Sequence, residues 1–385
     1  MSLSTDFWGD LARSNDAAAN AQSLPPIAYC DASVLEIEQK QVFSQGWLPV
    51  GRADQAKAPG DYVTLDICNR SIILIRGKAG ELYALANTCR HRGSRLLEGS
   101  GSCSGIRCPF HHWLYRLDGS LAAAPNIELA ADVDYSICRF KTAERLGFVF
   151  VSLMDDPPDI DLWLGNFAEV HKEWPLADLV QTRRRARDVA VNWKAFLDVF
   201  NEYYHLPYVH KTSIDARFQT PDPGDIVTGN FATQYGETDG SAALLEPQQT
   251  RAFPAMPGLE RKAARGVRYT WLFPCLSFAA AKEVAWVYEA YPINANKTRV
   301  IQTVAFHPAT VKRAEFDKTA RYYYDRMDRA LEEDVAALEF QAAGLKSPDA
   351  TQGPFSGRLE PSVAAFAQWY AKKMTVLDQS WEQSA

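Results

Sequence analysis

Four residues able to bind metal lie in two short segments, Cys89-x-His91 and Cys108-x-x-His111. Two thiolates and two imidazoles suit either a zinc ion or an iron–sulfur cluster. A Cys2His2 zinc finger places its second pair on a helix, whereas the segment after this second pair, "WLYRLDGS", is typical of a strand and a turn. Two such loops can hold a two-iron cluster, with the cysteines on one iron and the histidines on the other. The residues therefore favour a [2Fe–2S] cluster, with zinc as the alternative.

A second candidate metal site lies in Glu202-x-x-His205-x-x-x-x-His210. Residues three apart on a helix share a face, so we expect Glu202 and His205 to point together. Pro207 is expected to end or bend that helix, which would let His210 turn back. Two histidines and a carboxylate form the facial triad typical of ferrous iron, with positions left open for oxygen and substrate.

The first pair of segments resembles a known motif. "CRHRG" and "CPFHHW" are similar to the Rieske [2Fe–2S] motif of the Rieske non-haem iron oxygenases, whose second loop usually reads C-P-Y-H-G-W. The resemblance implies that the cluster is held by Cys89, His91, Cys108 and His111. His112 stands where the family has glycine, so we expect it to replace a loop glycine rather than to be a ligand.

The resemblance extends along residues 40–375. "NWKAFLDVFNEYYHLPYVHK" is similar to the iron-binding segment of choline monooxygenases, and "EEDVAALEFQAAGLKSP" resembles the segment that supplies the third ligand. The resemblance implies mononuclear iron bound by His205, His210 and Asp334. Three other acidic residues remain open as the carboxylate ligand: Asp325, Asp328 and Glu333. At Glu202 the family usually has an aspartate that carries electrons from the cluster of a neighbouring subunit. Betaine- and carnitine-type members have a similar glutamate.

The family membership implied here predicts an oxidoreductase, the terminal oxygenase component of a multicomponent system. It would use O2, with electrons from a separate NAD(P)H reductase, directly or through a ferredoxin, and it would form a homotrimer. No G-x-G-x-x-G fingerprint follows a strand, which agrees with a reductase on another chain. A Rieske electron carrier without oxygen chemistry is the remote alternative, because it would need neither the histidine pair nor Asp334.

The substrate class is predicted from the aromatic residues in the expected strands over 266–306. Trp286 and Tyr288 share one face of a strand by alternation, and aromatic faces attract quaternary ammonium groups. We therefore expect hydroxylation or oxidative N-demethylation of a betaine-, choline- or carnitine-type compound. The same rings suit a flat substrate, so mono- or dioxygenation of an aromatic acid is the alternative.

The chain of 385 residues is long enough for two structural units. We predict an α+β protein with an N-terminal helical segment (1–45), an all-β Rieske domain (46–155) and a catalytic domain (156–385). The last would be an antiparallel sheet with flanking helices, in a START-like helix-grip arrangement. Helices are expected at 31–44, 312–344 and 362–377, and residues 160–210 are expected to be mostly helical. We expect long loops over 213–262 and three strands over 266–306. "RRRAR" (183–187) is expected at a solvated strand edge, and His171 on a helix surface.

Composition excludes several classes of function. The net charge of −6 and the pI near 5.7 argue against a nucleic-acid-binding surface. No signal peptide and no membrane-spanning apolar run is evident, so a cytoplasmic location is expected. The seven cysteines are odd in number, and without an export signal they do not predict a disulfide framework.

Overall fold

The computed structural model describes residues 5–15, 21–211, 213–214 and 220–375. The chain forms two compact units, one made of residues 1–43 with 159–385 and the other of residues 44–158. The N-terminal segment thus groups with the C-terminal unit. The three-part division expected at 45/46 and 155/156 stays a prediction.

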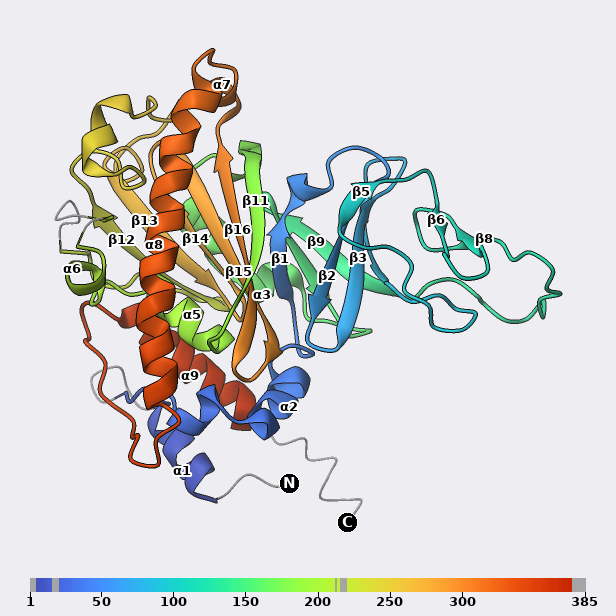
Figure 1. Ribbon diagram of the computed structural model, residues 1–385, viewed down its shortest axis with the longest axis horizontal. Helices are drawn as coiled ribbons and strands as arrows, with labels where there is room; N and C mark the ends of the chain where they lie inside the picture. The colour runs from blue at the N-terminus through green and yellow to red at the C-terminus, as the bar shows by residue number, and fades with distance from the viewer. Residues whose placement is uncertain (1–4, 16–20, 212, 215–219, 376–385) are drawn as a thin grey trace. The chain divides into compact units, whose positions relative to one another are not determined.

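The unit of residues 44–158 is all-β (Figure 1). Its main sheet has seven antiparallel strands in the order β1-β10-β9-β4-β3-β2-β5, and a second sheet has the order β6-β7-β8. The strands are β1 (Leu48–Arg52), β2 (Asp61–Ile67), β3 (Arg70–Arg76), β4 (Leu82–Ala86), β5 (Ser100–Ser102), β6 (Ile106–Arg107), β7 (Leu114–Tyr115), β8 (Leu121–Ala123), β9 (Arg139–Arg145) and β10 (Phe148–Ser152). A short 3-10 helix covers Ala53–Gln55. The predicted turns at "KAGE" and "LDGS" connect β3 to β4 and β7 to β8.

The other unit contains a six-stranded antiparallel sheet in the order β11-β16-β15-β14-β13-β12. Strands β12 to β16 follow one another as neighbours, and β11 pairs with β16 at the edge. The strands are β11 (Val180–Val189), β12 (Phe231–Glu237), β13 (Gly266–Leu272), β14 (Leu276–Ala280), β15 (Val284–Asn294) and β16 (Lys297–Phe306). Residues 266–306 form four strands rather than three, because the chain turns between Ala281 and Glu283.

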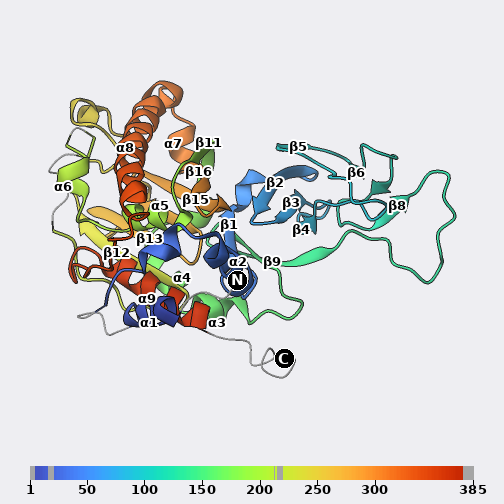
Figure 2. The ribbon, with the colours of Figure 1, turned by 60° about the horizontal axis from the view of Figure 1, so that its bottom comes forward.

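Helices complete this unit. They are α1 (Thr5–Arg13), α2 (Ala32–Gln41), α3 (Ile160–Leu164), α4 (Phe167–His171), α5 (Trp193–Phe200), α6 (Leu206–Val209), α7 (Pro308–Val311), α8 (Phe316–Gly344) and α9 (Pro361–Thr375). The 3-10 helices are Pro26–Tyr29, Leu176–Asp178 and Glu246–Arg251. Helix α8 packs against α5 and α6 and lies over the sheet, as Figures 1 and 2 show. Among the described residues, no helix is both long and apolar enough to cross a membrane.

Asp31 shows why α2 begins where the sequence predicts. Its side chain accepts a hydrogen bond from the backbone N–H of Ser33, which satisfies a donor that the first turn leaves free. The α+β class is likewise confirmed, whereas the START-like detail stays a prediction.

Three further expectations for this unit were wrong. The segment 160–210 is not mostly helical, because β11 occupies ten of its residues. The expected loop 213–262 contains β12, whose first six residues are all buried. His171 is fully buried rather than on the surface, and it bonds to the Phe167 carbonyl and to Thr270 Oγ1, both at 2.7 Å. Burial lowers the pKa of His171 to about 3, so this histidine is neutral.

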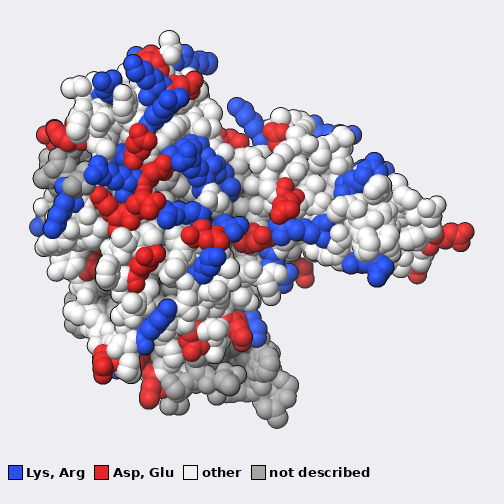
Figure 3. Space-filling view, viewed as in Figure 1, with Lys and Arg blue, Asp and Glu red and all other residues white. Residues whose placement is uncertain are grey.

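The arginines of "RRRAR" lie on the edge strand, as predicted, but three of them pair with acidic side chains of α8, and Arg184 pairs with Glu289 of β15 at 3.5 Å. Arg183 and Arg185 contact Asp328 at 2.5 and 3.2 Å, and Arg187 contacts Glu332 at 2.5 Å. Figure 3 shows basic and acidic side chains interspersed over this face, with no continuous basic patch. These ion pairs give the basic run a structural role within this unit.

Candidate metal centres

The two Cys–His segments form neighbouring loops at the end of the all-β unit. Cys89 follows β4 and Cys108 follows β6, and both side chains are buried. The rings of His91 and His111 meet edge to face with their centroids 4.7 Å apart. His91 also stacks on the buried Trp113 at 5.1 Å. The structure thus brings the four predicted cluster ligands together.

The surroundings of the Cys108 sulfur favour a thiolate. Burial raises the pKa of Cys108, but the backbone N–H groups of Phe110 and His111 and a bond with Cys89 outweigh burial and lower it. The hydroxyl of Tyr115 lies 3.2 Å from Cys89 Sγ and accepts the N–H of Arg90 at 3.0 Å. Its own proton is therefore free to point at the sulfur. Donors aimed at sulfur are what a cluster with bound cysteinates requires.

His112 adopts a left-handed backbone conformation, with φ of 60°. Its N–H donates to the Cys108 carbonyl at 3.1 Å, which closes the tight turn of the second loop. This conformation is strained for a residue with a Cβ and free for glycine. His112 is exposed, in agreement with its expected role as a replacement for a loop glycine.

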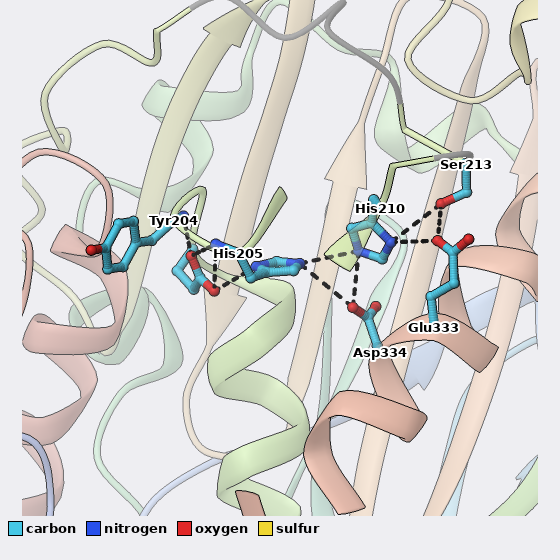
Figure 4. A network of polar contacts seen from close by, with 7 residues as sticks. Tyr204, His205, His210, Ser213, Glu333 and Asp334 are labelled. Carbon is cyan, nitrogen blue, oxygen red and sulfur yellow. Dashed lines mark hydrogen bonds and ion pairs between the residues drawn. The ribbon is translucent and has the colours of Figure 1, made fainter. Parts of the chain in front are cut away.

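The second site begins where α5 ends (Figure 4). The helix stops at Phe200, so Glu202 and His205 are not on one helix, contrary to expectation. Pro207 lies in the first turn of the short helix α6 and starts a helix rather than ending one, since its fixed φ and missing N–H suit that position. His205 and His210 flank α6 as its two caps.

Three side-chain atoms converge on one point between α6 and α8. His205 Nε2 lies 3.1 Å from His210 Nε2, and Asp334 Oδ1 lies 3.5 and 2.9 Å from these two nitrogens. On their far sides, the Nδ1 atoms contact the carboxylates of Glu202 at 2.5 Å and Glu333 at 2.8 Å. An ionised carboxylate only accepts, so each Nδ1 carries the proton and each Nε2 presents a lone pair.

Three electron-rich atoms this close repel one another unless a cation lies among them. The metal-free protein supplies a proton instead. Burial lowers the pKa of His205, but hydrogen bonds with Asp334 and Glu202 raise it overall to about 9. For Asp334 the balance has the opposite sign. Burial raises the pKa of this carboxyl group, but hydrogen bonds and charge interactions with His205 and His210 together have the larger effect, so the pKa is lowered overall. A divalent metal in place of the proton satisfies the same three atoms, so the residues fit a mononuclear iron site.

The remaining acidic candidates lie elsewhere. Asp325 is exposed, and Asp328 pairs with the arginines of β11. Glu333 contacts the far nitrogen of His210 and accepts a hydrogen bond from Ser213. The orienting role of Glu333 was not anticipated from the sequence. The only indication in the sequence was that Glu333 directly precedes Asp334, the expected ligand, on a predicted helix.

A pocket of about 420 Å³ opens beside the three converging atoms. Aromatic rings make up much of its wall, and beside Tyr203 they are Phe200, Tyr269, Trp286 and Tyr288. We call Phe200, Tyr269, Trp286 and Tyr288 the aromatic cage. Phe200 meets Tyr269 and Tyr288 edge to face with centroids 5.5 and 4.8 Å apart. Gln302 Nε2 donates to the Tyr288 hydroxyl at 2.9 Å and fixes that ring.

Comparison with known proteins identifies the chain. Residues 176–376 match the model of the ring hydroxylating alpha subunit (catalytic domain), and residues 46–133 match the Rieske [2Fe-2S] domain. The chain belongs to the ring-hydroxylating alpha-subunit family. Its cofactors are accordingly a Rieske [2Fe–2S] cluster and a mononuclear iron, and it is an oxidoreductase.

Two relatives and one solved structure illustrate where this alpha subunit stands. It is 28% identical to the glycine betaine monooxygenase oxygenase subunit of Pseudomonas aeruginosa (strain UCBPP-PA14), over 98% of this chain and 93% of the relative. It is 30% identical to the carnitine monooxygenase oxygenase subunit of Escherichia coli (strain K12), over 85% of each chain. The crystal structure of the quaternary ammonium Rieske monooxygenase CntA with L-carnitine is similar, with a TM-score of 0.77 and 26% identity, covering 97% of this chain and 100% of that chain.

Proposed function

We propose that this alpha subunit hydroxylates an N-methyl group of a quaternary ammonium compound. One oxygen atom of O2 enters the C–H bond, and the other leaves as water after taking up two electrons and two protons. The N-hydroxymethyl product then breaks its C–N bond, releasing formaldehyde, a proton and a tertiary amine. The observation that carries the proposal is the aromatic cage directly beside the three metal-binding atoms. The names of the relatives support it.

The cage suits a quaternary ammonium group for a physical reason. Ring faces carry negative charge density, and they attract a cation that cannot donate hydrogen bonds. Burial raises the pKa of Tyr269 to about 12, so this phenol stays neutral and leaves no anion to compete. When bound, the iron supplies the activation of O2, while the cage holds the N-methyl group towards it.

We assign His205, His210 and Asp334 as the iron ligands, and Cys89, His91, Cys108 and His111 as the cluster ligands. Glu202 then has two tasks. It holds His205 with Nδ1 protonated and Nε2 free, as carboxylates next to metal-bound histidines do. It also carries electrons from the cluster of a neighbouring subunit to the iron. This second task requires a head-to-tail homotrimer, a closed ring of heterologous contacts.

The proposed system has further components. A separate NAD(P)H reductase, acting directly or through a ferredoxin, refills the cluster, and the assembly works in the cytoplasm. A solved quaternary ammonium Rieske monooxygenase that is 27% identical to this chain gave insights into inter-subunit electron transfer, and this similarity supports the arrangement.

The test is a single turnover that needs no reductase. Iron-loaded protein is reduced with dithionite, freed of reductant and mixed with O2 and one compound from a panel of betaines, carnitine, choline and aromatic acids. We expect formaldehyde with an N-methyl compound and about three irons per chain. A His205→Ala variant should keep the cluster spectrum and release no formaldehyde. Hydroxylated aromatic product without formaldehyde from any N-methyl compound would refute the proposal.

A further inference from the structure

One charged side chain of the pocket has no role in the chemistry described so far. Arg326 of α8 lines the pocket and is only 3% exposed. Its guanidinium hydrogen-bonds to the Tyr269 phenol and lies over the Trp286 ring, 5.7 Å from the centroid. Its Nε and Nη2 atoms have no hydrogen-bond partner among the residues that the structure describes.

The identity of the two unpartnered atoms is informative. Nε and Nη2 form one edge of the planar guanidinium, and their N–H bonds run parallel. This edge matches the two oxygens of a carboxylate, which it binds through two charge-assisted hydrogen bonds. The Tyr269 hydrogen bond and the Trp286 ring compensate only part of the desolvation cost of this buried guanidinium, because no anion faces its Nε and Nη2 atoms among the described residues. The pocket therefore contains a site that an anion would complete.

The position of Arg326 separates this site from the metal. Arg326, Ala330 and Asp334 are spaced four residues apart on α8, and all three line the pocket. At 1.5 Å rise per residue, the Cα atoms of Arg326 and Asp334 lie about 12 Å apart along the helix. A molecule in the cage thus has the metal-binding atoms near one end of this stripe and the guanidinium near the other.

The charge of Arg326 also determines which cations the cage accepts. The guanidinium shares the Trp286 ring with any occupant of the cage. A purely cationic occupant would face a fixed like charge in a pocket with little water to screen it. A zwitterion avoids this repulsion, because its own carboxylate lies between the two positive groups.

We propose that Nε and Nη2 of Arg326 bind the carboxylate of the substrate, so that the substrate is an N-methylated zwitterion and not an amino alcohol. The ammonium part of this inference rests on the proposed function, whereas the carboxylate part does not. Arg326 is then a residue that determines specificity by contacting the end of the substrate that does not react.

The experiment measures binding to the iron- and cluster-loaded protein by calorimetry without oxygen. The ligands are glycine betaine, choline as the cation without a carboxylate, and benzoate as the carboxylate without an ammonium group. The variants are Arg326→Gln, Arg326→Lys and, as a control, Arg321→Gln, which changes an exposed arginine of the same helix. Cluster absorbance and iron content verify that each variant is folded and loaded.

We expect the wild-type protein to bind glycine betaine more tightly than choline. Arg326→Gln should weaken glycine betaine about 10- to 100-fold, because two charge-assisted hydrogen bonds are lost, and should leave choline unchanged or tighter. Arg326→Lys should recover part of the loss, since lysine keeps the charge but not the two-pronged geometry. Arg321→Gln should bind all three ligands as the wild type does.

Two outcomes separate this inference from the proposed function. Equal weakening of glycine betaine and choline in Arg326→Gln would make Arg326 structural and overturn the inference, while formaldehyde release would keep the proposed function intact. Benzoate binding that depends on Arg326, with neither ammonium compound bound, would keep the carboxylate site and overturn the proposed function.

Discussion

Replacing Glu333 by glutamine should weaken iron binding without removing a ligand. The carboxylate lies 2.8 Å from His210 Nδ1, and the ring plus a metal–nitrogen bond of about 2.1 Å place it about 7 Å from the iron. With Asp334 bound, the site carries one net positive charge, so the attraction at an effective dielectric of about 20 is about 2.4 kcal/mol.

Two features of the site reduce this attraction. The Glu333 side chain is 22% exposed, and Arg329 lies 3.8 Å from its other oxygen. Solvent and this arginine should roughly halve the interaction, leaving about 1.2 kcal/mol, which corresponds to about an eightfold change in affinity. Glutamine keeps an oxygen that accepts from Nδ1–H, so the ring keeps its orientation.

The assay is an anaerobic titration of the apo-protein with ferrous iron against a competing chelator. Glu339→Gln is the matched control, because it removes a carboxylate from an exposed position of the same helix. An unchanged iron affinity in Glu333→Gln, or a loss equal to that of the control, would refute the electrostatic contribution of Glu333 to iron binding. Thermal unfolding of both variants verifies that the fold is intact.

Five further predictions concern the two metal centres. A proton on His205, with its pKa raised from 6.5 to about 9, competes with iron, so apparent iron affinity should rise about tenfold per pH unit between pH 7 and 9 and then level off. By the same linkage, in the metal-free protein the stability from this group should be complete below pH 6.5 and disappear as the pH rises through about 9, measured as melting temperature. Tyr115→Phe should lower the reduction potential of the cluster, because the hydrogen bond to Cys89 stabilises the electron-rich reduced state; an unchanged potential in a redox titration would contradict this. His112→Gly should leave the cluster spectrum unchanged. It should raise the free energy of unfolding by about 1 kcal/mol, because glycine adopts a positive φ without strain. Loss of the cluster in this variant would mean that His112, and not His111, is the ligand. Glu202→Gln should keep both metal centres filled and slow reoxidation of the cluster in stopped-flow absorbance; normal turnover would contradict its electron-transfer role.

Much of the fold was predictable because local patterns decide it. The turns "KAGE" and "LDGS" and the Asp31 cap are set by residues within a few positions of one another. Strand β12 was missed because its neighbours in sequence are rich in glycine and proline, and only pairing with β13 establishes the strand. His171 was misplaced for a similar reason, since its partner Thr270 is far away in the sequence.

The three residues that converge in the second site were easier to predict than the groups around them. His205 and His210 lie close together in the sequence, and resemblance supplied Asp334. Glu333 was predicted only as an alternative iron ligand, and Arg326 was not recognised, because the role of each depends on which face of α8 it occupies and on what that face meets. Counting back from Asp334 in steps of four would have indicated Arg326 as a residue of the same stripe.

The spacing of Arg326 and Asp334 on α8 determines the length of substrate that the proposed site can bind. Because one helix carries both Asp334, the proposed carboxylate ligand of the iron, and Arg326, the proposed distance between the reacting methyl group and the bound carboxylate is set by the number of helical turns between these two residues. Moving the arginine from position 326 to 330 would shorten that distance by about 6 Å, one step along the stripe. Members of the family that take longer or shorter zwitterions could therefore differ by the turn on which the arginine lies, with the metal site left untouched.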